Sequence, residues 1–408
     1  MKKNAVKIAL YLNYFVFAIL LNSVGIVILK SQSNYGVDEV QASILEAFKD
    51  LPIAIVSFFI ASFLPRIGYK KAMLIGLSLV ALACITMYFG NSFDAAKILF
   101  ATVGVSFALI KVSVYSLIGT VTNSQQEHNS LMSSIEGVFM IGIAVAYFLF
   151  PAFNSDNDPN SWLNVYWLLA ALIGISFLFL FFTPFEKTPQ LEQVNLTEDF
   201  VQMFRLLAKL LTIVFVISAF FFVMIEQGIM SWLPTFNKEV LHLPENVSIM
   251  MASILAISLS VGRLVAGVIT KKINWIWVLC FCVVMAMLVV VFVLPKTIGL
   301  QVATINKLSD IPLIAFAFPL VGLFIAPIYP LLNSVVLSAL PKQMHSSMTG
   351  LIVVFSALGG TLGSRIIGYL FKNEGPEKAF YYTLIPMFLL LISFFILKKL
   401  TAKNEIIN

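Results

Sequence analysis

The sequence predicts an all-α membrane protein with twelve transmembrane helices in two pseudo-symmetric six-helix bundles. Of the 408 residues, 60% are apolar and only 11% are charged, whereas roughly a quarter of a soluble domain is charged. The apolar residues form segments long enough to cross a ~30 Å hydrocarbon layer, which takes ~20 helical residues. The two halves of the chain also repeat the same order of segments and turns, which is typical of transporters.

Twelve apolar segments follow one another with short connections, so successive helices are expected to be antiparallel neighbours. They lie at 8–29, 39–64, 72–90, 95–121, 129–152, 161–184, 208–236, 245–270, 275–295, 310–339, 346–371 and 378–398. The longest polar stretch falls between the sixth and the seventh. We therefore predict an N-terminal bundle (1–185), a cytoplasmic central loop (186–207) and a C-terminal bundle (208–408).

Charge bias sets the expected topology. The first apolar run is too long for a signal peptide and is interpreted as a retained helix. Loops on one side of the predicted bundle carry roughly twice as many Lys and Arg as those on the other, which places both termini in the cytoplasm. Short loops favour a multi-pass protein of a bacterial inner (plasma) membrane, with the lipid bilayer as its surroundings and a monomer as the expected state.

Several function classes are disfavoured. Basic residues are spread over short loops, so no nucleic-acid partner is expected. Three cysteines and three histidines show none of the zinc spacings, so no metal site is predicted. No Walker loop or His-Glu-x-x-His motif is present. We therefore predict no enzyme, no catalytic residue and no cofactor.

Eight ionisable residues fall inside the apolar segments. They are Glu46, Lys49, Asp50, Lys111, Glu136, Glu226, Arg263 and Arg365. Each would cost roughly 2.5–3.5 kcal/mol at a lipid-facing helix centre. We therefore expect them to face the bundle interior, a water-filled cavity or one another.

The second segment carries the strongest local signal. Glu46 and Asp50 share one helix face, with Lys49 beside them and Pro52 close behind. One interpretation is that the two acids exchange a proton while Lys49 contacts a polar substrate. The alternative is a salt-bridge network that only joins the second helix to the fourth.

Two further charges lie in the first half. Lys111, in the fourth segment, is interpreted either as a binding group for an anionic substrate or as the counter-ion of the helix-two acids. Glu136, in the fifth, is interpreted as a proton relay or as a structural partner of the cytoplasmic gate.

The second half offers a candidate sugar site. Glu226 and Gln227 precede Trp232 in the seventh segment. Side chains that can hydrogen-bond to hydroxyls, next to an aromatic ring on which a sugar ring can pack, suit a sugar. Tyr329 and Asn333 flank Pro330 in the tenth segment and are candidate cavity residues, with plain packing as the alternative. Glu226 could instead pair with Arg263 or Arg365.

Two arginines remain. Arg263 is interpreted as a gating ion-pair residue, because it lies two turns before a Lys-Lys turn. Arg365 could bind an anion, or extend toward the outer surface and pair with a loop acid.

The turn after the second segment, Ala61-Ser-Phe-Leu-Pro65-Arg66-Ile-Gly68-Tyr69-Lys70, resembles the signature Gly-x-x-x-Asp-Arg-x-Gly-Arg-Arg of the major facilitator superfamily. It matches at Arg66, Gly68 and Lys70, and departs at Pro65, where the family has the Asp of a gate latch, and at Tyr69. The resemblance implies a gating role for the three matching residues.

Other stretches are similar to the fucose–proton symporter-type sugar permeases of that superfamily. They are Gln41-Ala-Ser-Ile-Leu, Glu226 six residues before Trp232-Leu-Pro-Thr-Phe236, Gly262-Arg263, Gly322-Leu-Phe with Ile328-Tyr-Pro330, and Thr349-Gly350 with Gly359-Gly360. In those symporters the coupling acids lie on helices one and four. Here Asn22 and Lys111 lie on these helices, so the proton path is absent or has moved to Glu46 and Asp50.

These observations predict a secondary active transporter that moves a small polar solute, a sugar or related compound, by alternating access. Symport with protons as the coupling ion is expected, because buried carboxylates can exchange protons between the two faces. A proton-driven exporter of organic acids, peptides or drugs is the alternative. A non-transporting membrane sensor is the alternative from another class.

Overall fold

A computed structural model describes residues 2–122, 125–155, 157–185, 201, 204–270, 272–297, 311–338 and 345–405. In these ranges every regular element is a helix, and eleven helices are long and apolar enough to cross a membrane. Helix α4 (Ile44–Ile67), 24 residues long, is not among the eleven and corresponds to the predicted second span. The prediction of an all-α membrane protein is confirmed.

The chain forms two compact units, described here separately. Unit 1 comprises Met1–Val37 and Phe48–Leu196, and unit 2 comprises Asp38–Ala47 and Thr197–Asn408. The first residues of α4 therefore group with unit 2 and the rest of that helix with unit 1. The domain boundaries given above stay predictions, and most of the central loop 186–207 lies outside the described residues.

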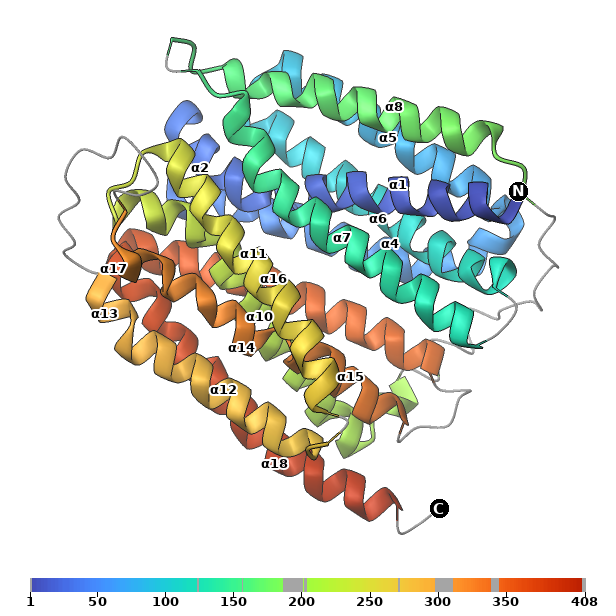
Figure 1. Ribbon diagram of the computed structural model, residues 1–408, viewed down its shortest axis with the longest axis vertical. Coiled ribbons are helices and arrows are strands. Elements are labelled where there is room, and N and C mark those ends of the chain that lie inside the picture. The colour runs from blue at the N-terminus through green and yellow to red at the C-terminus, as the bar shows by residue number, and fades with distance from the viewer. Residues whose placement is uncertain are drawn as a thin grey trace. The chain divides into compact units, whose positions relative to one another are not determined.

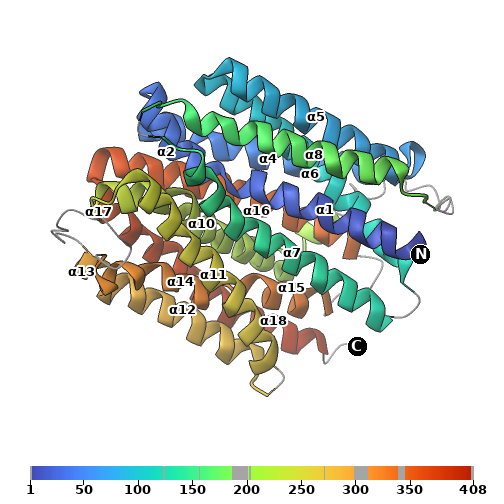
Figure 2. The same cartoon turned by 45° about the horizontal axis from the view of Figure 1, so that its top comes forward.

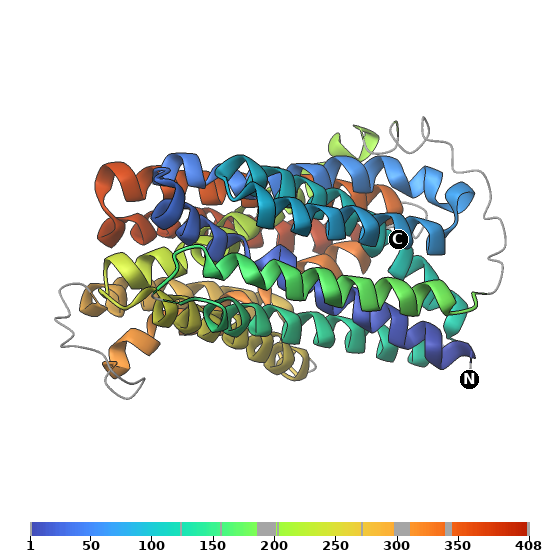
Figure 3. The same cartoon turned by 90° about the horizontal axis from the view of Figure 1, so that it is seen from above.

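Unit 1 is a bundle of long helices. Besides most of α4 it contains α1 (Lys2–Asn22), α2 (Val24–Tyr35), α5 (Tyr69–Gly90), α6 (Phe93–Val121), α7 (Gln125–Ala152), the short helix η1 (Ser161–Asn164) and α8 (Val165–Phe182). Helix α1 packs on α6 and α7, and α5 packs on α6 and α8 (Figure 1). Seen from above, the axes of the long helices of this unit are roughly aligned (Figure 3).

The first span is a helix interrupted at Ser23. The Ser23 hydroxyl donates to the Leu20 carbonyl at 2.8 Å, and Asn22 Nδ2 donates to the Ala18 carbonyl at 2.9 Å. Asn13 bonds the Ala9 carbonyl in the same way, at 2.7 Å. Local bonds of this kind satisfy side-chain donors where lipid offers no partner. Asn22 thus has a local structural role in the first span.

Unit 2 contains the remaining helices. They are α3 (Glu39–Ala42), α10 (Leu210–Glu239), α11 (Glu245–Ile269), α12 (Trp275–Phe292), α13 (Leu294–Thr297), η3 (Leu313–Phe316), η4 (Phe318–Leu320), α14 (Val321–Ile325), α15 (Ile328–Ser338), α16 (His345–Glu374), α17 (Pro376–Ala379), η6 (Phe380–Thr383) and α18 (Leu384–Glu405). Helix α10 packs on α11, α16 and α18 (Figure 2), and α12 packs on α14 and α18.

The tenth predicted span is the most irregular. It consists of η3, η4, α14 and α15, with Pro312 before η3, Pro319 inside η4 and Pro327 between α14 and α15. Proline removes a backbone donor and clashes with the preceding turn, so each ring interrupts an α-helix. The break before α15 places Tyr329 and Asn333 on a separate helix of unit 2.

Candidate functional site

Unit 1 holds an aromatic and charged cluster around Lys111, here called the Lys111 cluster. It consists of Tyr14 from α1, Phe107, Lys111 and Tyr115 from α6, and Glu136 and Phe139 from α7. The Lys111 ammonium lies 5.8 Å from the Phe107 ring centroid and 5.9 Å from that of Tyr115. These rings are one helical turn before and after Lys111, so they share its face of α6.

Helices α1 and α7 complete the cluster. The Tyr14 ring lies 6.1 Å from Phe107, 6.2 Å from Tyr115 and 5.7 Å from Phe139. The Tyr115 hydroxyl donates to Glu136 Oε1 at 2.7 Å. The Tyr14 hydroxyl is buried beside Tyr115 and makes no hydrogen bond of good geometry among the described residues. The cluster thus combines one ammonium, one carboxylate and aromatic rings inside a helix bundle.

No ion pair joins Lys111 to the helix-two acids in the described part of the chain. Lys49 instead contacts its neighbour Asp50, with 3.5 Å between Nζ and Oδ1. Glu46 is fully buried, and its Oε2 accepts a hydrogen bond from the Ser231 hydroxyl of α10 at 2.9 Å. The counter-ion interpretation of Lys111 therefore has no support in this structure.

Unit 2 holds a second polar cluster, around Glu226. Arg263 Nη2 donates to Glu226 Oε1 at 3.2 Å. This pairing was the predicted alternative to a role of Glu226 in sugar binding. Tyr329 stacks on Phe222 with centroids 5.5 Å apart, and its hydroxyl is 3.3 Å from that of Ser356. Helices α10, α11, α15 and α16 thus bring together several residues that the sequence had singled out.

This cluster has unused hydrogen-bonding capacity. Asn333 Oδ1 is buried and has no hydrogen-bond partner among the described residues. Gln227 is half-buried. A buried polar atom without a partner is unusual in a folded protein, so a ligand or ordered water is a natural occupant here.

Trp232 is placed differently from its predicted role at a ligand wall. Its ring is fully buried, and Nε1 donates to the Ser364 carbonyl at 2.9 Å. The ring packs on Phe371 with centroids 5.0 Å apart. Trp232 therefore joins α10 to α16 and presents no surface to a solute in this structure.

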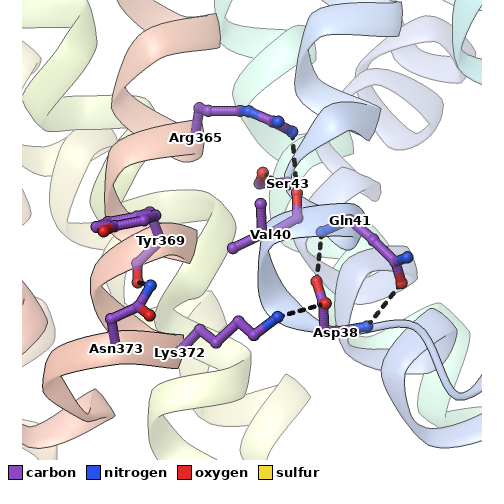
Figure 4. Close-up of polar contacts among 8 residues, drawn as sticks. All are labelled: Asp38, Val40, Gln41, Ser43, Arg365, Tyr369, Lys372 and Asn373. Atoms are coloured by element: carbon purple, nitrogen blue, oxygen red, sulfur yellow. Dashed lines mark hydrogen bonds and ion pairs between the residues drawn. The ribbon is translucent and has the colours of Figure 1, made fainter.

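The start of the second span is bound to α16 (Figure 4). Asp38 Oδ2 accepts from the Lys372 ammonium at 2.7 Å, and Arg365 Nη1 donates to the Val40 carbonyl at 3.0 Å. Arg365 was expected to bind an anion or a loop acid, but it contacts a backbone carbonyl, and Lys372 contacts the loop acid instead. Asp38 also caps α3, because its Oδ1 accepts from the Gln41 backbone N–H at 2.7 Å.

The Asp38 contacts predict a pH-dependent contribution to stability. The hydrogen bonds from Lys372 and from the Gln41 backbone lower the pKa of the Asp38 carboxyl below its usual value. A carboxyl whose pKa is lower in the folded state stabilises the fold above its unfolded pKa of about 4, and this contribution is lost as pH falls through the lowered pKa. Asp38→Asn should therefore destabilise the protein at pH 7 and have no effect below the lowered pKa.

Thermal unfolding in detergent at stepwise lower pH measures this. Asp38→Ala should cost about 1 kcal/mol more than Asp38→Asn at pH 7, because Asn retains the capping oxygen and Ala does not. Combining Asp38→Asn with Lys372→Met should give less than the sum of the single effects. A gap between wild type and Asp38→Asn that stays constant from pH 7 to the lowest pH tested would contradict the assignment.

Besides Arg263, two more of the predicted gating residues can be placed. Gly68 has φ +88° between α4 and α5, a backbone conformation that favours glycine. The Lys70 ammonium donates to the carbonyls of Phe181 and Thr183 at 2.7 and 2.8 Å, at the carboxyl end of α8, where a cation is favoured. The side chain of Arg66 lies outside the described residues, and the gating roles stay predictions.

Several residues of the Lys111 cluster, and Ser231, were not predicted from the sequence. Phe107 and Tyr115 could have been found, because they lie four positions either side of Lys111 on one helix. Tyr14 and Ser231 gave no such signal, since they meet their partners only through tertiary packing. No group of three metal-binding side chains occurs in the described ranges.

Comparison with known proteins identifies the family. The family model described as Major Facilitator Superfamily matches residues 10–364. No curated protein gives a significant match.

Solved transporters share the fold at low identity. A bacterial homolog of the human lysosomal transporter Spinster, in an inward-facing and occupied conformation, has a TM-score of 0.77 at 13% identity over 99% of this chain and 98% of its own. A point mutant of the nucleoside transporter NupG has 0.73 at 17% over 97% and 100%. A variant of the E. coli fucose–proton symporter FucP has 0.64 at 13% over 97% and 99%. The chain is a multi-pass membrane protein and belongs to the Major Facilitator Superfamily of transporters.

Proposed function

We propose that this protein is a secondary transporter that moves a small polar solute, a sugar or related compound, by alternating access and in symport with protons. Two features support the proposal. Each unit contains its own polar cluster within the membrane-spanning helices, and the similar structures include a fucose–proton symporter and a nucleoside transporter. A bacterial inner membrane, cytoplasmic termini and a monomeric state belong to the same proposal.

The observation that carries proton coupling is the environment of Glu136. This half-buried carboxylate accepts a 2.7 Å hydrogen bond from the neutral hydroxyl of Tyr115, and no described residue forms an ion pair with it. Protonation of Glu136 therefore breaks no ion pair: the Tyr115 hydroxyl donates to the ionised carboxylate and can accept from the protonated carboxyl. Such a group can gain and lose a proton in each transport cycle.

The helix-two acids fit a supporting role in the same cycle. Glu46 is fully buried and bonded to Ser231, and Asp50 contacts Lys49. In the proposed mechanism α3 leaves α16 and the first turn of α4 leaves α10 during transport, which frees Asp38 and Glu46 from their partners. Glu46 and Asp50 then become secondary proton sites.

Substrate contacts are assigned to the two clusters. Lys111 and Lys49 in unit 1, and Glu226, Gln227, Tyr329 and Asn333 in unit 2, supply charged and hydrogen-bonding groups. Trp232 would join them only after a rearrangement that exposes its ring. Gly68, Lys70, Arg66 and Arg263 are assigned to the gates.

Uptake into proteoliposomes tests the proposal. With an inwardly directed proton gradient, radiolabelled solutes from a panel of sugars, organic acids, amino acids and nucleosides are offered to the purified protein. We expect one class to accumulate above the external concentration and to lose this accumulation when a protonophore is added. Accumulation only under the opposite gradient would show an exporter, and saturable binding without any flux would show a sensor.

A further inference from the structure

We infer that the Lys111 cluster is a binding site for a sugar that carries a carboxylate group. This inference rests on the proposed transport function and narrows its substrate class. It starts from the surroundings of the Lys111 ammonium. Lys111 lies well inside the span of α6, yet in the described part of the chain it has no ion pair and donates no hydrogen bond.

An ammonium in this position needs a partner. The rings of Phe107 and Tyr115 stabilise it through their π faces, at centroid distances of 5.8 and 5.9 Å. That contact offsets only part of the hydration free energy that a lysine loses within the membrane. The side chain is only half-buried, so protein atoms do not cover it completely.

The surroundings of Lys111 favour a ring compound. The rings of Tyr115 on α6 and Phe139 on α7 are half-buried, and the apolar face of a pyranose packs well on aromatic rings. Glu136 lies next to these rings, held by Tyr115 at 2.7 Å, and its second oxygen can accept hydrogen bonds from sugar hydroxyls. One ammonium, one acceptor and aromatic faces together match an acidic sugar better than a neutral one.

Charge balance favours a carboxylate over a phosphate. The cluster contains one base, Lys111, and one acid, Glu136, so it is neutral before a ligand binds. When a monoanion binds, the cluster returns to zero net charge if Glu136 takes up one proton. A phosphate dianion would need a second positive charge. Phosphate is also recognised best by the fork of an arginine, which no described member of this cluster provides.

This arrangement links proton binding to substrate binding. Among the described residues, the titratable groups that interact with Glu136 include Lys111 and Tyr115 of α6 and Tyr14 of α1. A carboxylate bound to Lys111 adds a second negative charge beside Glu136, and the proton that Glu136 takes up in the proposed cycle balances it. One monoanion and one proton then cross together, and transport is electroneutral.

Binding to purified protein tests the site without any flux. Two matched pairs are compared by thermal shift: D-glucose with D-glucuronate, and D-galactose with D-galacturonate. D-glucose 6-phosphate provides the phosphate arm. We expect at least one acid to raise the unfolding temperature while its neutral partner does not. No shift with any acid at saturating concentration, a larger shift with a neutral sugar, or a preference for the phosphate overturns the inference.

Variants place the ligand at Lys111. Lys111→Gln should weaken binding of that acid about 10- to 100-fold, because a charge-assisted contact is lost, and Lys111→Arg should restore it. Lys97→Gln is the matched control, because Lys97 lies on the same helix over the Phe93 ring, 4.9 Å away, and contacts Asp94 at the surface. Unchanged affinity in Lys111→Gln, or equal losses in both Gln variants, contradicts the site.

Charge movement separates this inference from the proposed function. Once proton-driven uptake of the acidic sugar is established, its accumulation is measured under two driving forces. A potassium diffusion potential set by valinomycin should not change the extent of accumulation, whereas a pH gradient should. Accumulation of a neutral sugar with protons would keep the transport function and overturn the acidic substrate. Binding of the acid without flux would keep the site and overturn the transporter.

Discussion

Replacing Glu136 with Gln is expected to eliminate proton-driven accumulation while leaving exchange of substrate across the membrane intact. Under a gradient of one pH unit, a symporter that couples one proton to an electroneutral cycle concentrates its substrate about tenfold, since a pH unit corresponds to 1.36 kcal/mol. Gln has the size of Glu and still accepts a hydrogen bond from Tyr115, but it cannot carry the proton. The ratio of internal to external substrate should therefore fall from about ten to about one.

Counterflow in preloaded proteoliposomes measures the retained activity. Because exchange needs no net proton movement, Glu136→Gln should exchange labelled substrate at a rate comparable with wild type. Tyr115→Phe leaves the carboxylate in place and removes only its 2.7 Å donor, so this variant should reach the same final accumulation with an altered rate.

An exposed carboxylate provides the matched control for Glu136→Gln. Asp94, whose side chain is 84% exposed and pairs with Lys97, can be changed to Asn without touching the Lys111 cluster. That variant should accumulate substrate like wild type. Tenfold accumulation by Glu136→Gln would show that Glu136 does not carry the coupled proton. Glu46 and Asp50 would then be the remaining candidates.

The helices were predictable because hydrophobic length is a strong and local signal. A run of apolar residues that spans hydrocarbon must satisfy its backbone internally, and a helix does this within one segment. Interruptions inside spans were harder to predict. Ser23 ends α1 although serine is common in transmembrane helices, and its effect depends on the local bond to Leu20.

The charged residues show where sequence reasoning ends. That eight ionisable groups need partners followed from the cost of exposing them to lipid, and the Glu226–Arg263 pair was one of the alternatives. Glu46, by contrast, contacts a serine 185 positions away in the chain. Hydroxyl donors are so frequent in this sequence that no pattern singles out Ser231. Glu46, Lys49, Asp50 and Glu226 are buried, whereas Lys111, Glu136 and Arg263 are half-buried and Arg365 is exposed. Position along a helix therefore did not predict burial for all eight groups, and tertiary packing chose their partners.

Small residues between α10 and α16 lead to the second large expected effect. A Cβ added at Gly359 would lie 2.3 Å from the Phe220 carbonyl oxygen, and one at Gly363 would lie 2.2 Å from that of Met224. These glycines are four residues apart and face two α10 carbonyls with the same spacing, so the helix backbones are in direct contact, as in small-xxx-small motifs. The double variant Gly359→Ala/Gly363→Ala must separate the helices along this whole contact.

Each of these alanines should cost about 1–3 kcal/mol, the usual range for overpacking, and the pair should remove much of a typical net stability of about 5–15 kcal/mol. Thermal unfolding in detergent, followed by the fraction of monodisperse protein on size exclusion, measures the loss. Trp232 and Glu226 lie on the same helix as Phe220 and Met224, so the variant should also weaken any ligand binding at the Glu226 cluster.

Glycines with free space around them give the opposite expectation. A Cβ added at Gly137 of α7 or Gly174 of α8 meets no atom within 4 Å, so Ala there should stabilise the helix by about 0.5–1 kcal/mol. The sign of the change therefore depends on the neighbouring helix and not on the residue type. If Gly363→Ala were as stable as Gly137→Ala, the backbones of α10 and α16 could not be in contact, and the positions of Glu226 and Trp232 relative to α16 would need revision.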